Sequence, residues 1–114
     1  MLNKQVTFTV GLTTNQGAKL WPGYVIIETS KLLADDGIDG FTVTEHHGWW
    51  KGEPEKSLSF VVVYDSNELP EFSPGDTAAA MAKQFHQDAV LYVTHGVFAE
   101  LVGPPTRVQG ELKY

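Results

Sequence analysis

The sequence predicts an α+β fold whose elements follow the order β-α-β-β-α-β. Three observations support this prediction: the chain begins with strict polar and apolar alternation, two later strand-like segments flank a probable hairpin, and a helix with a clear start signal precedes a last apolar run. The 114 residues fit a single domain, with residues 103–114 as a short C-terminal tail. The composition, 42% hydrophobic and 19% charged, is typical of a globular protein.

The first two elements are predicted from their periodicity. Residues 4–12 alternate apolar and polar side chains, which is the pattern of a strand with one buried face. Residues 23–36 place apolar side chains at helical spacing, and Gly37 provides a glycine cap, so we expect a helix there. Residues 24–27 alone are β-branched enough for a strand, but the continuing helical pattern favours the helix.

A hairpin, a helix and a last strand complete the prediction. Residues 41–50 and 56–64 read as strands joined by a connection over residues 51–55. A helix is expected to start at Pro74, after a capping serine, and to run to about residue 87. The apolar run over residues 89–102 predicts a fourth strand that is interrupted or bulged near Gly96.

With right-handed crossovers, this order predicts a ferredoxin-like arrangement, a four-stranded antiparallel sheet with both helices on one face. The third strand also predicts the character of the opposite face of the sheet. Leu58, Phe60, Val62 and Tyr64 can face the helices, so Val61 and Val63 must point away from them. Apolar residues on both faces predict a homo-oligomer packed through the sheet. Two alternatives would explain Val61 and Val63 without an oligomer. They can be β-forming residues on a partly exposed sheet, or the C-terminal tail can fold back over this face through Pro104 and Pro105.

Charge and composition exclude several classes of function. The net charge of −6 disfavours nucleic-acid binding, because phosphates would be repelled and the basic residues are scattered. The chain has no cysteine, which excludes disulfides and thiolate sites and fits the cytoplasm, or the host cytoplasm for a viral protein. No stretch is long and apolar enough for a signal peptide or a membrane span. We expect no cofactor and no membrane partner.

Residues 42–53 hold the densest chemistry of the chain. Alternation places Glu45, His47 and Trp49 on the helix side of the sheet and Thr44, His46 and Trp50 on the open side, unless a bulge at Gly48 swaps the later assignments. This segment is therefore the predicted contact region for a ligand or a protein partner. The residues predicted to bind are His46, His47, Trp49, Trp50, Lys51 and Glu53.

Histidines in this segment raise the question of metal binding or proton transfer. Glu45 and His47, joined in space by His86 or His95, could chelate a metal or form an acid/base pair. Without a zinc-type motif, ordinary hydrogen bonding is favoured and no metal site is predicted. If the protein is an enzyme, the predicted catalytic groups are His47, Glu45 and His95.

The adjacent tryptophans allow two interpretations. Trp49 and Trp50 can form a stacking platform for a planar ligand such as a base, with Lys51 meeting a phosphate. Alternatively, one tryptophan belongs to the core and the other to a subunit contact. Trp21 is expected to anchor the core or a loop.

Residues 39–44 and 48–53, followed by a strand from Ser57, resemble short uncharacterised proteins of phages and prophages. The resemblance implies a viral accessory protein that blocks a host protein or sequesters a small signalling molecule. The His46-His47 pair and the doubled tryptophan do not match that pattern.

The favoured hypothesis is a non-enzymatic oligomeric protein that binds a host protein or a nucleotide-like ligand through its hairpin. One alternative is a small dimeric α/β-barrel enzyme with a histidine-based acid/base site. The other is a structural oligomer of a virion or complex.

Overall fold

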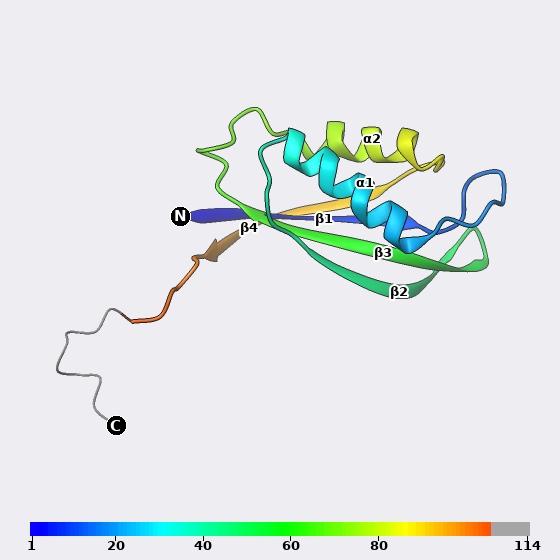
Figure 1. Ribbon diagram of the computed structural model, residues 1–114, viewed down its shortest axis with the longest axis horizontal. Coiled ribbons are helices and arrows are strands. Elements are labelled where there is room, and N and C mark those ends of the chain that lie inside the picture. The colour runs from blue at the N-terminus through cyan, green and yellow to red at the C-terminus, as the bar shows by residue number, and fades with distance from the viewer. Residues whose placement is uncertain (106–114) are drawn as a thin grey trace, which may run out of the picture.

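The computed structural model describes residues 1–105 and has the predicted ferredoxin-like arrangement. The four strands form one antiparallel sheet in the order β2-β3-β1-β4. Figure 1 shows both helices packed on the same face of this sheet, with the other face open. The elements are β1 (Leu2–Gly11), α1 (Pro22–Asp35), β2 (Thr42–Trp50), β3 (Glu53–Tyr64), α2 (Pro74–Gln84) and β4 (Leu91–Ala99).

The core lies between the sheet and the helices. In the two central strands, Val6 pairs with Val62 and Phe8 with Phe60, so the side chains of each pair point to one face. All four are fully buried, and burial of each such side chain stabilises the fold by about 1.5–3 kcal/mol. The helices complete this core with Val25, Leu33, Met81 and Phe85.

Both helices end in the same type of cap. Gly37, at φ 86°, donates its N–H to the carbonyl of Ala34, and the next residue bonds back to Leu33, so the predicted glycine cap is confirmed. Helix α2 starts as predicted, with Ser73 Oγ accepting from the Asp76 N–H at 3.3 Å. It ends at Gln84 rather than near residue 87, because His86 adopts φ 51° in an equivalent cap. Neither described helix is long and apolar enough to cross a membrane.

The hairpin connection is shorter than predicted. Only Lys51 and Gly52 form the loop, with φ of 51° and 80°, and β3 begins at Glu53. Positive φ at both loop positions matches the twist of the flanking strands, so the strands pair down to the loop. Pro54 is tolerated within β3 because β1 ends at Gly11, opposite Ser57, and leaves that part of β3 without a neighbour on one side.

Strand β4 is an edge strand with an irregular register. Leu2 pairs with Ala99, whereas Lys4 pairs with Gly96, so β4 has one extra residue after Gly96 and the predicted bulge is confirmed. Residues 100–105 lead away from the body of the fold, as Figure 1 shows. Because Leu101 and Val102 are exposed, these residues do not cover the open face of the sheet. The rest of the predicted tail, residues 106–114, lies outside the described residues.

Candidate functional site

Strand pairing determines which side chains of the hairpin share a face. Glu45 pairs with Leu58 and His47 with Lys56, which places these residues on the helix side. His46, Gly48 and Trp50 pair with Ser57, Glu55 and Glu53 on the open side. The register runs through Gly48 without a bulge, so the alternation expected from the sequence holds along the whole strand.

A groove of about 510 Å³ lies on the open side, where the hairpin meets the loop after β1 and the start of β4. Pockets for small ligands typically have volumes of about 300–1,000 Å³, so the groove has a suitable size. We call it the hairpin groove. Its lining includes Thr9, Gly11, His46, Gly48, Trp50, Lys51, Glu55, Ser57, Gln87 and Asp88.

Gly48 leaves a gap in the row of side chains that forms one wall of the groove. A Cβ at this position would meet no atom within 4 Å. His46 and Trp50 stand two residues away on either side, and a strand rises about 3.3 Å per residue, so about 13 Å separates their backbones. The missing side chain therefore creates a socket between an imidazole and an indole. Trp50 is 49% exposed beside it.

Hydroxyl groups surround His46 on the floor of the groove. His46 Nε2 lies 2.6 Å from Ser59 Oγ, which lies 2.9 Å from Thr9 Oγ1. Ser57 Oγ, in a buried residue, is 3.4 Å from His46 Nδ1. This network holds the ring in one orientation and presents polar atoms next to the socket.

Glu55 stands directly across the strands from Gly48. Its Oε1 atom overlies the point where a side chain on Gly11 would begin, so the carboxylate rests against bare backbone. Desolvation by burial raises the pKa of Glu55, and the charge of Lys19 partly opposes that shift. A carboxylate that is partly removed from water and faces a groove is a candidate functional group.

An ion pair closes the rim of the groove. Lys51 Nζ lies 3.0 Å from Asp88 Oδ2 and 5.7 Å from the centre of the Trp50 ring. The hydrogen bond from Lys51 lowers the pKa of Asp88. Both side chains are exposed, so the pair contributes little to stability and can rearrange when a ligand enters. Lys51 is paired in this structure, so a phosphate would have to displace Asp88 to meet it.

Two of the three predicted catalytic residues lie together, and the third lies far from them. Glu45 and His47 line a second cavity of about 420 Å³ on the helix side, which shares Lys19 and Glu55 with the hairpin groove. His95 lies on β4, the edge strand opposite β2, and pairs with Gln5 of β1. Its side chain is on the open face, whereas Glu45 and His47 are on the helix side. His86 follows α2, where its carbonyl accepts from the Asn15 N–H. Within residues 1–105, no three His, Asp or Glu side chains are grouped to hold a metal ion.

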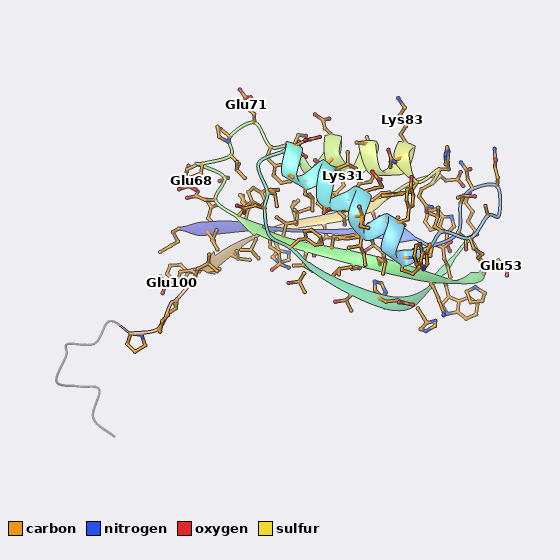
Figure 2. All side chains as sticks on the ribbon, viewed as in Figure 1. Lys31, Glu53, Glu68, Glu71, Lys83 and Glu100 are labelled. Carbon is orange, nitrogen blue, oxygen red and sulfur yellow. The ribbon has the colours of Figure 1, made fainter. Side chains whose placement is uncertain are left out.

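The tryptophans do not form a joint platform. Trp49 and Trp50 point to opposite faces of β2, and only Trp50 stands beside the socket. Trp49 is 75% and Trp50 49% exposed, so neither residue belongs to the core and that part of the interpretation is wrong; the subunit contact stays a prediction. Trp21, at 78% exposure, is likewise no core anchor. In Figure 2, the label of Glu53 shows where the hairpin end of the molecule lies. Glu53 and Trp49 both line the hairpin groove at this end.

Comparison with known proteins adds information on the fold. No protein-family model and no curated protein matches the sequence. A phage SAM lyase in complex with S-methyl-5′-thioadenosine is similar in structure, with a TM-score of 0.60 and 15% identity over 89% of this chain and 93% of that chain. A phage SAM lyase in the apo state gives 0.60 and 16%, covering 90% and 94%.

A third solved structure is a DUF3240 family protein from Shewanella baltica OS155. It has a TM-score of 0.57 and 10% identity, covering 91% of this chain and 100% of that chain. At such low identities these likenesses show the shared fold and nothing finer. Two of the three neighbours are phage proteins, which agrees with the phage resemblance of the sequence.

Proposed function

We propose that this chain is a small-ligand binding protein whose hairpin groove takes a nucleoside-like molecule. The observation that carries the proposal is the socket over Gly48, with an indole on one side and an imidazole within a hydroxyl network on the other. Such a site offers a flat apolar surface and several hydrogen-bonding groups within one groove. These are the two features that a nucleoside, a planar base on a polyhydroxylated sugar, requires.

Trp50 is the stacking surface in this proposal. A base stacked on an indole gains about 1–3 kcal/mol in favourable sites, and the half-exposed Trp50 ring borders the empty socket. The structural likeness to a phage SAM lyase that holds S-methyl-5′-thioadenosine supports the choice of ligand class, since that molecule is an adenine nucleoside thioether. The groove also offers Thr9, Ser57 and His46 as polar partners.

Calorimetric titration with S-methyl-5′-thioadenosine tests this proposal. We expect saturable binding to the wild-type chain and a loss of roughly 5- to 100-fold in affinity for Trp50→Ala. Trp21→Ala is the matched control, because Trp21 is equally an exposed tryptophan but lies outside the groove. No binding to the wild type, or an equal loss in both variants, would contradict the proposal.

A second candidate is a small enzyme that acts on an adenosyl compound in the same groove. The contact of 2.6 Å between His46 Nε2 and Ser59 Oγ favours it, because an imidazole within hydrogen-bond reach of a hydroxyl is suited to proton transfer. The test is incubation with SAM, followed by mass spectrometry for S-methyl-5′-thioadenosine. Turnover that His46→Ala abolishes would support the enzyme; loss on His47→Ala or His95→Ala instead would return the role to those groups.

We also propose that a second copy of the chain covers part of the open face. Val61 and Val63 of β3 and Leu91 and Val93 of β4 share this face, and the last three are 36%, 63% and 49% exposed. Thr7 of β1 lies between Val61 and Val93, and Leu91 also lines the edge of the hairpin groove. Exposed apolar residues on two strands of one face favour a partner, and symmetric dimers are the commonest assembly. Native mass spectrometry should give a multiple of the chain mass. A monomer would leave a host protein as the partner for this face, and recovery in purified virions would favour the structural role.

A further inference from the structure

Two acceptor oxygens converge beside Gly11 in the floor of the hairpin groove. Glu55 Oε1 overlies the point where a Gly11 side chain would begin, and Gln87 Oε1 lies 3.0 Å from that point. The orientation of the Gln87 amide follows from its own bonds: its Nε2 donates to the carbonyls of Thr13 and Phe85, both at 3.1 Å. Only the amide oxygen is therefore turned toward Glu55.

No protein donor satisfies this pair of oxygens. Among residues 1–105, the Glu55 carboxylate accepts no hydrogen bond and forms no ion pair within 4.0 Å. Lys19, whose charge lowers the pKa of Glu55, donates instead to Thr13 Oγ1 at 3.4 Å. Water still reaches this half-buried carboxylate, but the described residues around it offer no donor, so the arrangement suits a ligand that brings donors.

We infer that Glu55 binds the vicinal hydroxyl groups of a ribose, and so makes the hairpin groove selective for ribonucleosides. This inference rests on the proposed function and names the part of the ligand that is recognised. Two adjacent O–H groups can donate to the two oxygens of one carboxylate, as acidic residues do to ribose in dinucleotide sites. Gln87 Oε1 adds a further acceptor at the same place.

The position of Glu55 fits a sugar attached to a stacked base. Glu55 faces Gly48 across the strands, and directly paired side chains begin about 4.5–5.5 Å apart. Trp50 is two residues further along β2, so a base lying against it above Gly48 places its sugar near Glu55. A bare backbone at Gly11 is what allows the carboxylate to rest there, because any side chain would collide with it.

The alternative occupant is a cationic group, which would also be attracted to a carboxylate. Lys19 and Lys51 line the groove together with Glu53, Glu55 and Asp88, so its charges alone do not exclude a cation. The pairing of Asp88 with Lys51 neutralises both groups, which leaves Lys19 against Glu53 and Glu55. The hydroxyl pair is favoured because a nucleoside also supplies a base for Trp50, and the two occupants can be separated by experiment.

The experiment is calorimetric titration of the full chain with adenosine, 2′-deoxyadenosine and 3′-deoxyadenosine. We expect the wild type to bind adenosine roughly 10- to 100-fold more tightly than either deoxy compound, because each lost hydroxyl removes a hydrogen bond to a charged group. Glu55→Gln should lose most of that preference by weakening adenosine alone. Glu68→Gln, at the opposite end of the molecule in Figure 2, is the matched control and should keep it.

Equal affinity of the wild type for all three compounds, or an unchanged preference in Glu55→Gln, would overturn the inference while the proposed function stands. Tighter binding of SAM than of S-methyl-5′-thioadenosine, lost in Glu55→Gln, would overturn it in favour of a cationic group. If no nucleoside binds the wild type, the proposed function fails together with the inference.

Discussion

The two faces of the sheet differ in what their residues do, although the same strands supply both. On the covered face, every second residue of β1 and β3 from Val6 to Val10 and from Leu58 to Tyr64 is buried under the helices. On the open face, the alternate positions are polar near the hairpin, where Thr9, Ser57 and Ser59 meet His46. Further along, β3 contributes Val61 and Val63, whereas β1 stays polar at Thr7 and Gln5. Core packing therefore determines the residues of the covered face, whereas the open face combines a polar groove with the apolar side chains of β3 and β4.

The largest expected contrast lies between two adjacent residues of β3. Phe60→Ala should lower the free energy of unfolding by about 3–5 kcal/mol, because it leaves a cavity in the core. Val61→Ala, on the open face one residue later, should cost less than about 1 kcal/mol in the isolated chain. Urea unfolding followed by tryptophan fluorescence measures both. Similar values for the two variants would show that the open face is covered as well.

The polar part of the open face can be tested at Ser59. Ser59→Ala removes the shared partner of His46 and Thr9 and should lower the free energy of unfolding by about 1–2 kcal/mol. Thr44→Ser, directly opposite Ser59 but outside this hydrogen-bond network, is the control and should change stability by less than about 0.5 kcal/mol. Unfolding in urea again gives the comparison. An effect of Ser59→Ala as small as that of the control would mean that the network contributes nothing.

The apolar part of the open face should respond to charge in its association rather than in its folding. Val63→Lys is expected to alter the free energy of unfolding by less than about 0.5 kcal/mol, because the side chain is exposed. It should nevertheless dissociate an oligomer built on this face, since a buried unpaired lysine is unfavourable. Light scattering during gel filtration measures the mass. An unchanged oligomer would place the interface elsewhere.

The fold was predictable because local signals and periodicity agree in most elements. Alternation from Val6 to Val10 predicts β1, and Ser73 with Pro74 predicts the start of α2, since both patterns depend on neighbours in the chain. The hairpin loop was predicted too long. Residues 53–55 look like a turn in composition, yet strand pairing extends to them once Lys51 and Gly52 complete the reversal.

The site was predictable only in part. His46, Trp50 and Lys51 stand out as a chemically dense segment and do line the groove. Ser57 and Glu55 were missed because the error in loop length hid their pairing with His46 and Gly48; a two-residue loop would have revealed it. Thr9 and Gln87 come from β1 and from the end of α2, and only the tertiary structure brings them to the groove.

The smallest expected effect concerns Glu55 and depends on pH. Burial raises the pKa of Glu55 above its ordinary value of 4.5, so the folded state binds this proton more tightly than the unfolded state does. Stability is therefore lost as the pH rises from about 4.5 through the folded pKa. Glu55→Gln has no such titration, and it should be more stable than the wild type at pH 7 by less than about 0.5 kcal/mol.

Urea unfolding of both proteins at pH 4, 5.5 and 7 checks this prediction, with a difference that grows with pH. Asp65 and Asp88, whose lowered pKa values give the opposite slope, are present in both proteins and cancel in the difference. A variant that is less stable at pH 7 would mean that the carboxylate supports the fold. A more stable variant that has lost its preference for ribonucleosides would indicate the opposite: Glu55 is held in an unfavourable place because ligand binding requires it there.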